Sequence, residues 1–292
     1  MAAAVDALRG YVSLTKPRIL LLVIFTGLPV LLMGETWPGM GFAAATLLGI
    51  ALAASAANTL NCYIERDRDA LMERTRNRPL PAARLDPTSA LAFGLVLAVV
   101  STLLLQAVAG PVAAGLGVAS ILFYVFVYTV WLKPRSAWNA VVGGAAGAAA
   151  PLIADAAVHG TVGPAGWSLF AIIFFWQPPH VWAIALFRKE DYARAGIPML
   201  PNLLGDEPTR WRMLWYTLAL VPVTLAPLLL GLLGAVYGAA ALVLNAWFVW
   251  HMIRVLRERT EVAARRLFHV SLGYLFALFL AMLVDRVFPV AL

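Results

Sequence analysis

The sequence predicts an all-α membrane protein that crosses the bilayer nine times. Hydrophobic residues make up 62% of the 292 residues and the mean hydropathy is +0.83, so lipid surrounds most of the chain. Uncharged runs of about twenty residues recur, which is the length that one helical crossing needs. Because a bilayer offers no partner for free backbone groups, and the alternation of a β-barrel is missing, each run is expected to be helical.

The nine predicted spans cover residues 19–34, 41–62, 89–109, 112–132, 139–158, 167–187, 213–233, 235–253 and 269–288. Prolines within spans, such as Pro29, Pro222 and Pro227, kink a helix without excluding it, since neighbouring helices can satisfy the freed groups. We predict that the pair Pro178 and Pro179 breaks its helix. The expected architecture is one transmembrane domain over residues 1–292, with a central cavity that opens towards the cytoplasmic side.

The N-terminal segment and the single cysteine narrow the choice of compartment and chemistry. The segment before the first span has charge but no apolar core, so no cleavable signal is predicted. Cys62 alone excludes an internal disulfide and a thiolate metal cluster. We interpret it as a small residue packed in a helix.

The basic residues fix the predicted orientation of the chain. If the N-terminus is cytoplasmic, 21 of the 22 Lys and Arg residues fall in cytoplasmic segments, and only Arg286 lies near the outer face. This asymmetry is the positive-inside pattern of membrane proteins. It also explains the net charge of +7 without a nucleic-acid partner. The composition favours a bacterial plasma (inner) membrane over the mitochondrial inner membrane.

The acidic residues need a separate explanation, because orientation requires only the basic ones. Nine of the fifteen fall in two cytoplasmic loops, 63–88 and 188–212, with their flanks. If the second span continues as a helix, Asn61, Glu65 and Asp69 share one face, while Asp67 points elsewhere. Such a row suits Mg²⁺, which is usually held by one or two carboxylates plus substrate phosphates. The alternative is a solvated helix end with ion pairs between neighbouring turns.

A second charged cluster favours the metal interpretation. FRKEDYARAGIPMLP, from Phe187 to Pro201, again places carboxylates and basic residues directly after an apolar span on the same side. Two such clusters can face one another across a cavity. The first then supplies metal ligands, and the second supplies further ligands, Glu190 and Asp191, with cations for phosphate.

These residues resemble the motifs of a known family. The stretch from Asn61 to Asp69, followed by RTRNRPLP from Arg74 to Pro81, is similar to the first signature of the intramembrane prenyltransferase superfamily. Within it, LTKPRI at 14–19, WQPPHVWAIALFRKEDY at 176–192 and AGIPMLP at 195–201 resemble the protoheme IX farnesyltransferase branch. Two departures from the superfamily are Glu65, where Asp is usual, and a second motif with fewer acidic residues.

The resemblance implies a reaction, its substrates and its partners. The branch transfers farnesyl from farnesyl diphosphate to a vinyl group of haem b, and water adds to give haem O. It implies Mg²⁺ as cofactor and a site in contact with membrane lipid. It also implies contact with the next enzyme of haem A synthesis or with cytochrome oxidase assembly proteins. In this interpretation Arg74 and Tyr192, which lie within the motifs, contact substrate.

The chemistry of the residues agrees with that reaction. An allylic diphosphate ionises when its leaving group is neutralised, and Glu65 and Asp69 can hold the Mg²⁺ that helps to do so. Ring faces stabilise the resulting cation. The candidate cations for the diphosphate are Arg78, Lys133, Arg135, Arg188 and Lys189, and candidate rings include Tyr124, Tyr128 and Trp176. Packing within the membrane is the alternative explanation for each ring.

His180 is a further candidate, because histidine inside a span is uncommon and usually faces a partner or a cavity. Three interpretations stay open: a core histidine bonded to another helix, a ligand to haem iron, and a donor to the diphosphate. A break at the preceding prolines would turn the imidazole towards the site. His251 and His269 are alternatives for iron.

Two rival functions share parts of this pattern. A quinone or chlorophyll prenyltransferase would use the same metal loops with another acceptor. A transporter would place its ionisable residues near the bilayer midplane on broken helices. Here most of them lie near one membrane face and no internal repeat stands out, which ranks transport third.

Overall fold

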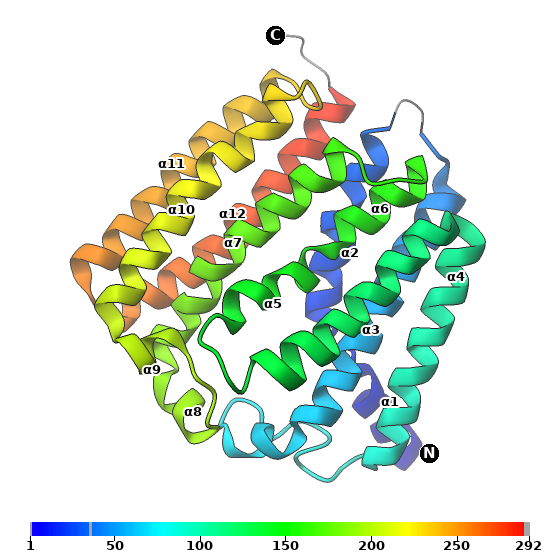
Figure 1. Cartoon of the computed structure of the whole chain (residues 1–292), viewed down its shortest axis with the longest axis vertical. Helices are drawn as coiled ribbons and strands as arrows, with labels where there is room; N and C mark the ends of the chain where they lie inside the picture. The colour runs from blue at the N-terminus through cyan, green and yellow to red at the C-terminus, as the bar shows by residue number, and fades with distance from the viewer. Residues whose placement is uncertain (1, 35–36, 289–292) are drawn as a thin grey trace.

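The computed structural model describes residues 2–34 and 37–288, with side chains described from residue 5. Within these residues it contains helices and no strand, which confirms the all-α class (Figure 1). The elements are α1 (Ala2–Leu14), α2 (Pro17–Leu32), α3 (Met40–Leu71), α4 (Pro87–Leu122), η1 (Phe123–Leu132), α5 (Asn139–Gly147), α6 (Ala149–His159), α7 (Pro164–Phe187), α8 (Lys189–Arg194), α9 (Leu200–Leu204), α10 (Asp206–Leu229), α11 (Ala235–Glu258) and α12 (Glu261–Val287).

The helices account for a multi-pass membrane protein. Seven are long and apolar enough to cross a membrane, and α1 with α2 forms an eighth candidate, bent by 47°. The longest, Pro87–Leu132, has 46 residues, whereas one crossing needs about twenty. Gly110 breaks it with φ 82°, a conformation that glycine adopts readily. Leu105 packs against Gly117, so the two halves run side by side. The nine spans predicted from the sequence are therefore an approximate count beside the seven or eight candidate spans of the described residues.

Acidic side chains at the ends of the spans cap helices that follow them or lie beside them. The Asp86 carboxylate accepts a hydrogen bond from the Ser89 N–H at 2.7 Å, at the start of α4. Asp155 accepts from the Gly163 N–H at 2.6 Å before α7, and Asp285 accepts from the Gly234 N–H at 2.6 Å before α11. The first N–H groups of a helix have no partner within it, so these carboxylates satisfy donors that lipid could not.

The predicted break at Pro178 and Pro179 is wrong. α7 continues from Pro164 to Phe187, and both prolines are buried in it. The irregular backbone lies instead in the preceding span, where α5 ends and α6 begins at Ala148 (φ −90°, ψ 0°). Backbone irregularity at membrane depth is tolerated where it lines a cavity. Gly147 and Ala149, on either side of Ala148, line the central cavity described below.

One end of the bundle gathers the charged segments. In Figure 1, α1, the loop after α3, and α8 with α9 all lie at the lower end, while the described chain finishes at the upper end. α3 is 32 residues long, and its last two turns extend towards this loop region. Residues from several loops far apart in sequence therefore meet around the end of α3.

Candidate active site

The last turns of α3 bury one polar face. Asn61, Glu65 and Asp69 are 1%, 4% and 1% exposed, whereas Asp67 is exposed. Their spacing of four places them one above another along a single helix face. We predicted a shared face only if the helix continues past the apolar run. α3 does continue, to Leu71, so this prediction is confirmed.

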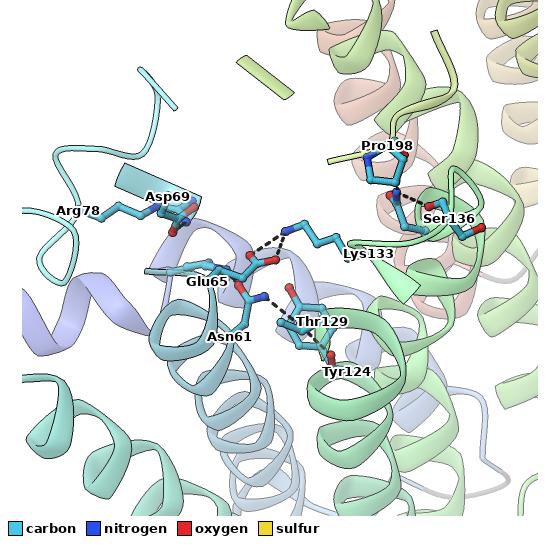
Figure 2. A network of polar contacts seen from close by, with 11 residues as sticks. Asn61, Glu65, Asp69, Arg78, Tyr124, Thr129, Lys133, Ser136 and Pro198 are labelled. Atoms are coloured by element: carbon cyan, nitrogen blue, oxygen red, sulfur yellow. Dashed lines mark hydrogen bonds and ion pairs between the residues drawn. The ribbon is translucent and has the colours of Figure 1, made fainter. Parts of the chain in front are cut away.

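Each of these three side chains meets a cation from another part of the chain. Lys133 Nζ lies 2.7 Å from Glu65 Oε2 and 2.5 Å from Oε1, as Figure 2 shows. Arg78 Nη1 lies 2.6 Å from Asp69 Oδ2. Lys16 Nζ donates to Asn61 Oδ1 at 3.0 Å. The face thus carries two carboxylates, one amide and three cations, which we call the α3 cluster.

Electrostatic interactions in the α3 cluster keep Lys133 and Arg78 in their charged forms. Burial opposes the charge on Lys133, but its neighbours, with the Glu65 carboxylate bonded to it, raise its pKa above the usual value. Burial also opposes the charge on Arg78. The attraction of the Asp69 carboxylate is larger than this effect of burial, so the pKa of Arg78 is raised.

The segment η1 shapes the wall opposite α3. It is π-helical, since the Lys133 N–H bonds the Tyr128 carbonyl five residues back at 2.8 Å. The Thr129 hydroxyl donates to the Tyr124 carbonyl at 2.8 Å and accepts from Asn61 Nδ2 at 3.0 Å. π-helical turns are rare and often lie at functional sites. Here the wider turn ties Thr129 to α3 and lets Lys133 reach Glu65.

A cavity of about 200 Å³ lies between α2, α3, η1, α5, α6 and α7. Its lining is mainly apolar, with Tyr124 and Tyr128 on one wall and Asn58, Ser120, Asn139 and Gln177 as polar exceptions. The two tyrosine rings lie 5.1 Å apart. Lys133 Nζ is 5.6 Å from the Tyr128 ring, so the cavity begins where the α3 cluster ends.

The second predicted cluster forms a polar cavity of about 240 Å³ at the ends of α7 and α8, lined also by Glu73 and by Glu190. Asp191 is buried and accepts a hydrogen bond from the Glu73 N–H at 3.4 Å, which joins the loop after α3 to α8. Arg194 bonds Asp191, and Arg188 lies 3.7 Å from it.

Two more contacts tie this second motif to its surroundings. Lys189 Nζ bonds Asp206 Oδ1 at 2.9 Å, across to the start of α10. Asn139 Nδ2 donates to the Pro198 carbonyl at 3.0 Å and so connects the start of α5 to the AGIPMLP stretch. The second motif is therefore tied to α10 and α5 as well as to the loop after α3, which it meets through the Glu73 N–H bond to Asp191.

Three predicted substrate-binding residues, Arg74, Arg135 and Tyr192, lie outside the α3 cluster and line neither the central cavity nor the polar one. Arg74 is exposed in the loop after α3. Arg135 is also exposed, and its Nη1 donates to the Val130 carbonyl at 2.9 Å on its own segment. Tyr192 packs with a small apolar cluster that includes Met72.

Trp176 and His180 face α12 and do not line the central cavity. Trp176 is buried, and its Nε1 donates to the Ser271 carbonyl at 2.8 Å. His180 Nδ1 lies 2.7 Å from Ser271 Oγ, so the hydrogen bond to another helix, one of the three interpretations, is present. The other candidate histidines lie apart from this pair: His251 is buried on α11, and His269 is exposed with Nδ1 bonded to Arg265 O on its own helix.

Sequence reasoning did not single out four polar residues of the site, namely Lys16, Asn58, Thr129 and Gln177. A signal was available for Lys16, which stands in the LTKPRI motif. Gln177 Oε1 is buried without a hydrogen bond, against Gly144 of α5. A polar residue within an apolar span is the signal for Gln177, since such groups are expensive in a membrane unless they serve a site.

The α3 cluster fits Mg²⁺ shared with a phosphate-bearing substrate. Its oxygens are of the type that Mg²⁺ prefers, and the buried carboxylates of Glu65 and Asp69 lie on one helix face beside Lys133 and Arg78. Among the described residues, no three or more acidic, His or Cys side chains are spaced to hold a metal by themselves. The structure therefore does not bring Glu190 and Asp191 into one ligand group with Glu65 and Asp69.

Comparisons of the sequence with known proteins point to one family. The profile of the UbiA prenyltransferase family matches residues 20–283. A relative named Protoheme IX farnesyltransferase from Acidiphilium cryptum (strain JF-5) is 48% identical over 287 residues, 94% of this chain and 90% of the relative. A relative of the same name from Symbiobacterium thermophilum is 45% identical over 283 residues, 96% of this chain and 95% of the relative.

Solved structures share the fold at low sequence identity. A digeranylgeranylglyceryl phosphate synthase aligns with a TM-score of 0.81 and 17% identity, over 98% of this chain and 99% of that one. A UbiA homologue from Archaeoglobus fulgidus bound to GPP and Mg²⁺ aligns with a TM-score of 0.65 and 15% identity, over 94% and 99%. On this agreement of sequence, fold and motifs, the chain belongs to the UbiA prenyltransferase family, on its protoheme IX farnesyltransferase branch, and is a membrane-bound prenyltransferase.

Proposed function

We propose that this chain transfers the farnesyl group of farnesyl diphosphate to a vinyl group of haem b, with addition of water, to give haem O and diphosphate. One observation supports the choice of substrates. Relatives between 45% and 48% identical, aligned over about 95% of the chain, carry the name Protoheme IX farnesyltransferase. The geometry supports the reaction class, since a charged cluster borders an apolar cavity.

The diphosphate binds at the α3 cluster in this proposal. Lys16, Arg78 and Lys133 converge there from three different segments. Their charges exceed those of Glu65 and Asp69 by one, so the cluster attracts an anion, and Mg²⁺ on the carboxylates strengthens that attraction. When bound, Mg²⁺ neutralises charge that develops on the departing diphosphate. Asn61 orients the site through its bonds to Lys16 and Thr129.

The second motif positions the loops around the substrate. Asp191 bonds the Glu73 N–H, so the loop that carries Arg78 is held against α8. Arg188 and Lys189 line the polar cavity beside it and present positive charge towards the same end of the bundle. We assign them to the diphosphate or to the carboxylates of the acceptor.

The apolar cavity receives the farnesyl chain and protects the reacting carbon. Tyr124 and Tyr128 offer ring faces beside Lys133, where a cation on C1 of the chain is stabilised. The vinyl carbon forms a bond to C1 as the C1–O bond to diphosphate breaks. The cation left on the porphyrin side takes the oxygen of water, and one proton is released. No nucleophilic side chain takes part.

We also propose a bacterial plasma membrane and a cytoplasmic N-terminus. The lower end of the bundle in Figure 1 carries α1 and both charged loops, and 21 of the 22 basic residues belong to segments predicted on that side. An active site at this end then takes its water-soluble diphosphate from the cytoplasm.

A comparison of acceptors tests the proposal. Membranes that contain the chain are supplied with Mg²⁺ and radiolabelled farnesyl diphosphate, together with haem b or with 4-hydroxybenzoate. We expect label in a porphyrin product and none in the benzoate, and no transfer by the Asp69→Asn variant. Transfer to the benzoate but not to haem b would assign the chain to quinone-type chemistry instead.

A further inference from the structure

His180 is held between α7 and α12 by contacts with two aromatic rings and with one hydroxyl. Its ring stacks on Trp176 at a centroid distance of 4.4 Å and an angle of 21°. Phe268 of α12 lies 4.9 Å away. Nδ1 lies 2.7 Å from Ser271 Oγ on the same helix. The ring plane and the direction of its second nitrogen, Nε2, are therefore fixed.

The Ser271 hydroxyl has a second partner besides His180. Its hydroxyl donates to the Phe268 carbonyl at 2.7 Å. A hydroxyl has one proton, so while it donates to the Phe268 carbonyl Oγ accepts at its contact with His180. In that arrangement the proton between the two side chains belongs to Nδ1 of the imidazole, and Nε2 of the neutral ring carries a lone pair.

We propose that Ser271 is a positioning residue, which holds His180 in the Nδ1–H tautomer and presents Nε2 as a ligand for the iron of a porphyrin. This inference rests on the proposed function for the identity of the ligand. Within residues 2–34 and 37–288 Nε2 has no hydrogen-bond partner, and it is not fully buried. Neutral imidazole with a free nitrogen is a common metal ligand, and its other N–H is usually held by a fixed acceptor.

The surroundings of Ser271 are those of a rigid support. Ser271 is fully buried, and its backbone carbonyl accepts from Trp176 Nε1 at 2.8 Å. One residue of α12 thus fixes both the aromatic ring beneath His180 and the proton on its edge. Iron held by Nε2 would fix a flat macrocycle about one axis, which orients the edge that carries its vinyl group.

The tautomer can be measured without any substrate. The full chain is labelled with ¹⁵N-histidine in lipid nanodiscs, and the signals of His180 are assigned from their loss in His180→Asn, since the chain has four histidines. We expect Nδ1 protonated and Nε2 bare in the wild type and in Ser271→Thr, which keeps the hydroxyl. In Ser271→Ala the two tautomers should mix. A proton on Nε2 in the wild type, or an unchanged spectrum in Ser271→Ala, would overturn the proposal.

Iron ligation is measured by titration with ferric haem b, followed by the Soret band. Ser271→Ala should bind about tenfold more weakly with an altered spectrum, as loss of the partner of a metal-ligating histidine commonly does. Ser271→Thr should match the wild type. Ser101→Ala is the matched control, because Ser101 is equally buried and bonds the Gly49 carbonyl at 3.0 Å, between α4 and α3.

The outcomes separate this inference from the proposed function. An equal loss of haem affinity in Ser101→Ala would reduce Ser271 to packing, an unchanged Soret band in Ser271→Ala would remove its positioning role, and an unchanged Soret band in His180→Asn would remove iron from the assignment. A wild-type protein that binds haem b through Nε2 without prenylating it would support the ligand role and contradict the proposed reaction. The substrate-free spectra decide the tautomer in either case.

Discussion

Lys133 Nζ lies 2.7 Å from Glu65 Oε2 and joins two side chains that are 68 positions apart in the sequence. The pair connects the end of η1 to the polar face of α3, and both side chains are largely buried. A buried charge that loses its partner is strongly destabilising. The pair therefore contributes to folding as well as to the proposed binding of diphosphate, and the two roles can be separated.

The first prediction separates them with a double variant. Lys133→Met leaves Glu65 unpaired, so we expect a loss of about 3 kcal/mol or more of stability and of about 100-fold in activity. Adding Glu65→Gln removes the uncompensated charge and should restore much of the thermal melting temperature without restoring turnover. Recovery of turnover in the double variant would show that neither charge acts on the substrate.

The second prediction concerns metal dependence. Asp69→Asn should lower activity by about 100-fold while the protein still accumulates in membranes, because the amide keeps a bond to Arg78. Glu65→Asp should be milder, since it restores the side chain that is usual in the superfamily. Activity is measured against Mg²⁺ concentration, with a chelator as the zero point. Asp67→Asn on the exposed face of α3 is the control, and an equal loss in that variant would count against the site.

The third prediction concerns orientation. Arg74 and Arg194 are both exposed and belong to the two loops that Asp191 joins. Single cysteines placed at these positions should be labelled by an impermeant reagent only after the cytoplasmic side is opened. Cys62 is buried and gives little background. Labelling of either position in intact cells would reverse the proposed orientation.

The fourth prediction concerns pH and the cap of α4. Hydrogen bonds from the Ser89 N–H and hydroxyl lower the pKa of Asp86. A carboxyl whose pKa is lower in the folded state stabilises the fold above its unfolded pKa of about 3.9, and this stabilisation is lost as the pH falls through the folded value.

The melting temperatures of Asp86→Ala and the wild type should therefore differ at neutral pH and converge in acid. Asp86→Asn, which caps without a charge, should keep its advantage over Asp86→Ala at both pH values. A difference between Asp86→Ala and the wild type that does not change with pH would mean that the charge contributes nothing.

The parts of the fold that depend on local pattern were predictable. Uncharged runs mark the spans, and the Gly110–Pro111 pair marks the reversal between residues 109 and 112. The effect of Pro178 and Pro179 was not predictable from the sequence, because neighbouring helices decide whether a proline breaks a span. The π-helical turn of η1 also depends on contacts with α3, so no local signal for it was found.

The candidate site also has features that the local sequence predicts and features that only the tertiary structure determines. The shared face of Asn61, Glu65 and Asp69 follows from helical period alone, which a sequence displays. The pairing of Lys133 with Glu65 and of Lys16 with Asn61 spans 68 and 45 positions, and only tertiary structure selects these partners among the available cations. His180 was found by its rarity within a span, but its orientation towards Ser271 depends on how α7 packs on α12.

The product formed in isotopic water tests the proposed reaction most directly. The purified chain in lipid is supplied with haem b, farnesyl diphosphate and Mg²⁺ in H₂¹⁸O, and the mass of the porphyrin product is measured by mass spectrometry. We predict haem b enlarged by one farnesyl group and one hydroxyl that carries ¹⁸O, and none of this product from Asp69→Asn. Haem b recovered unchanged, or a farnesylated porphyrin without the labelled oxygen, would contradict the proposed reaction.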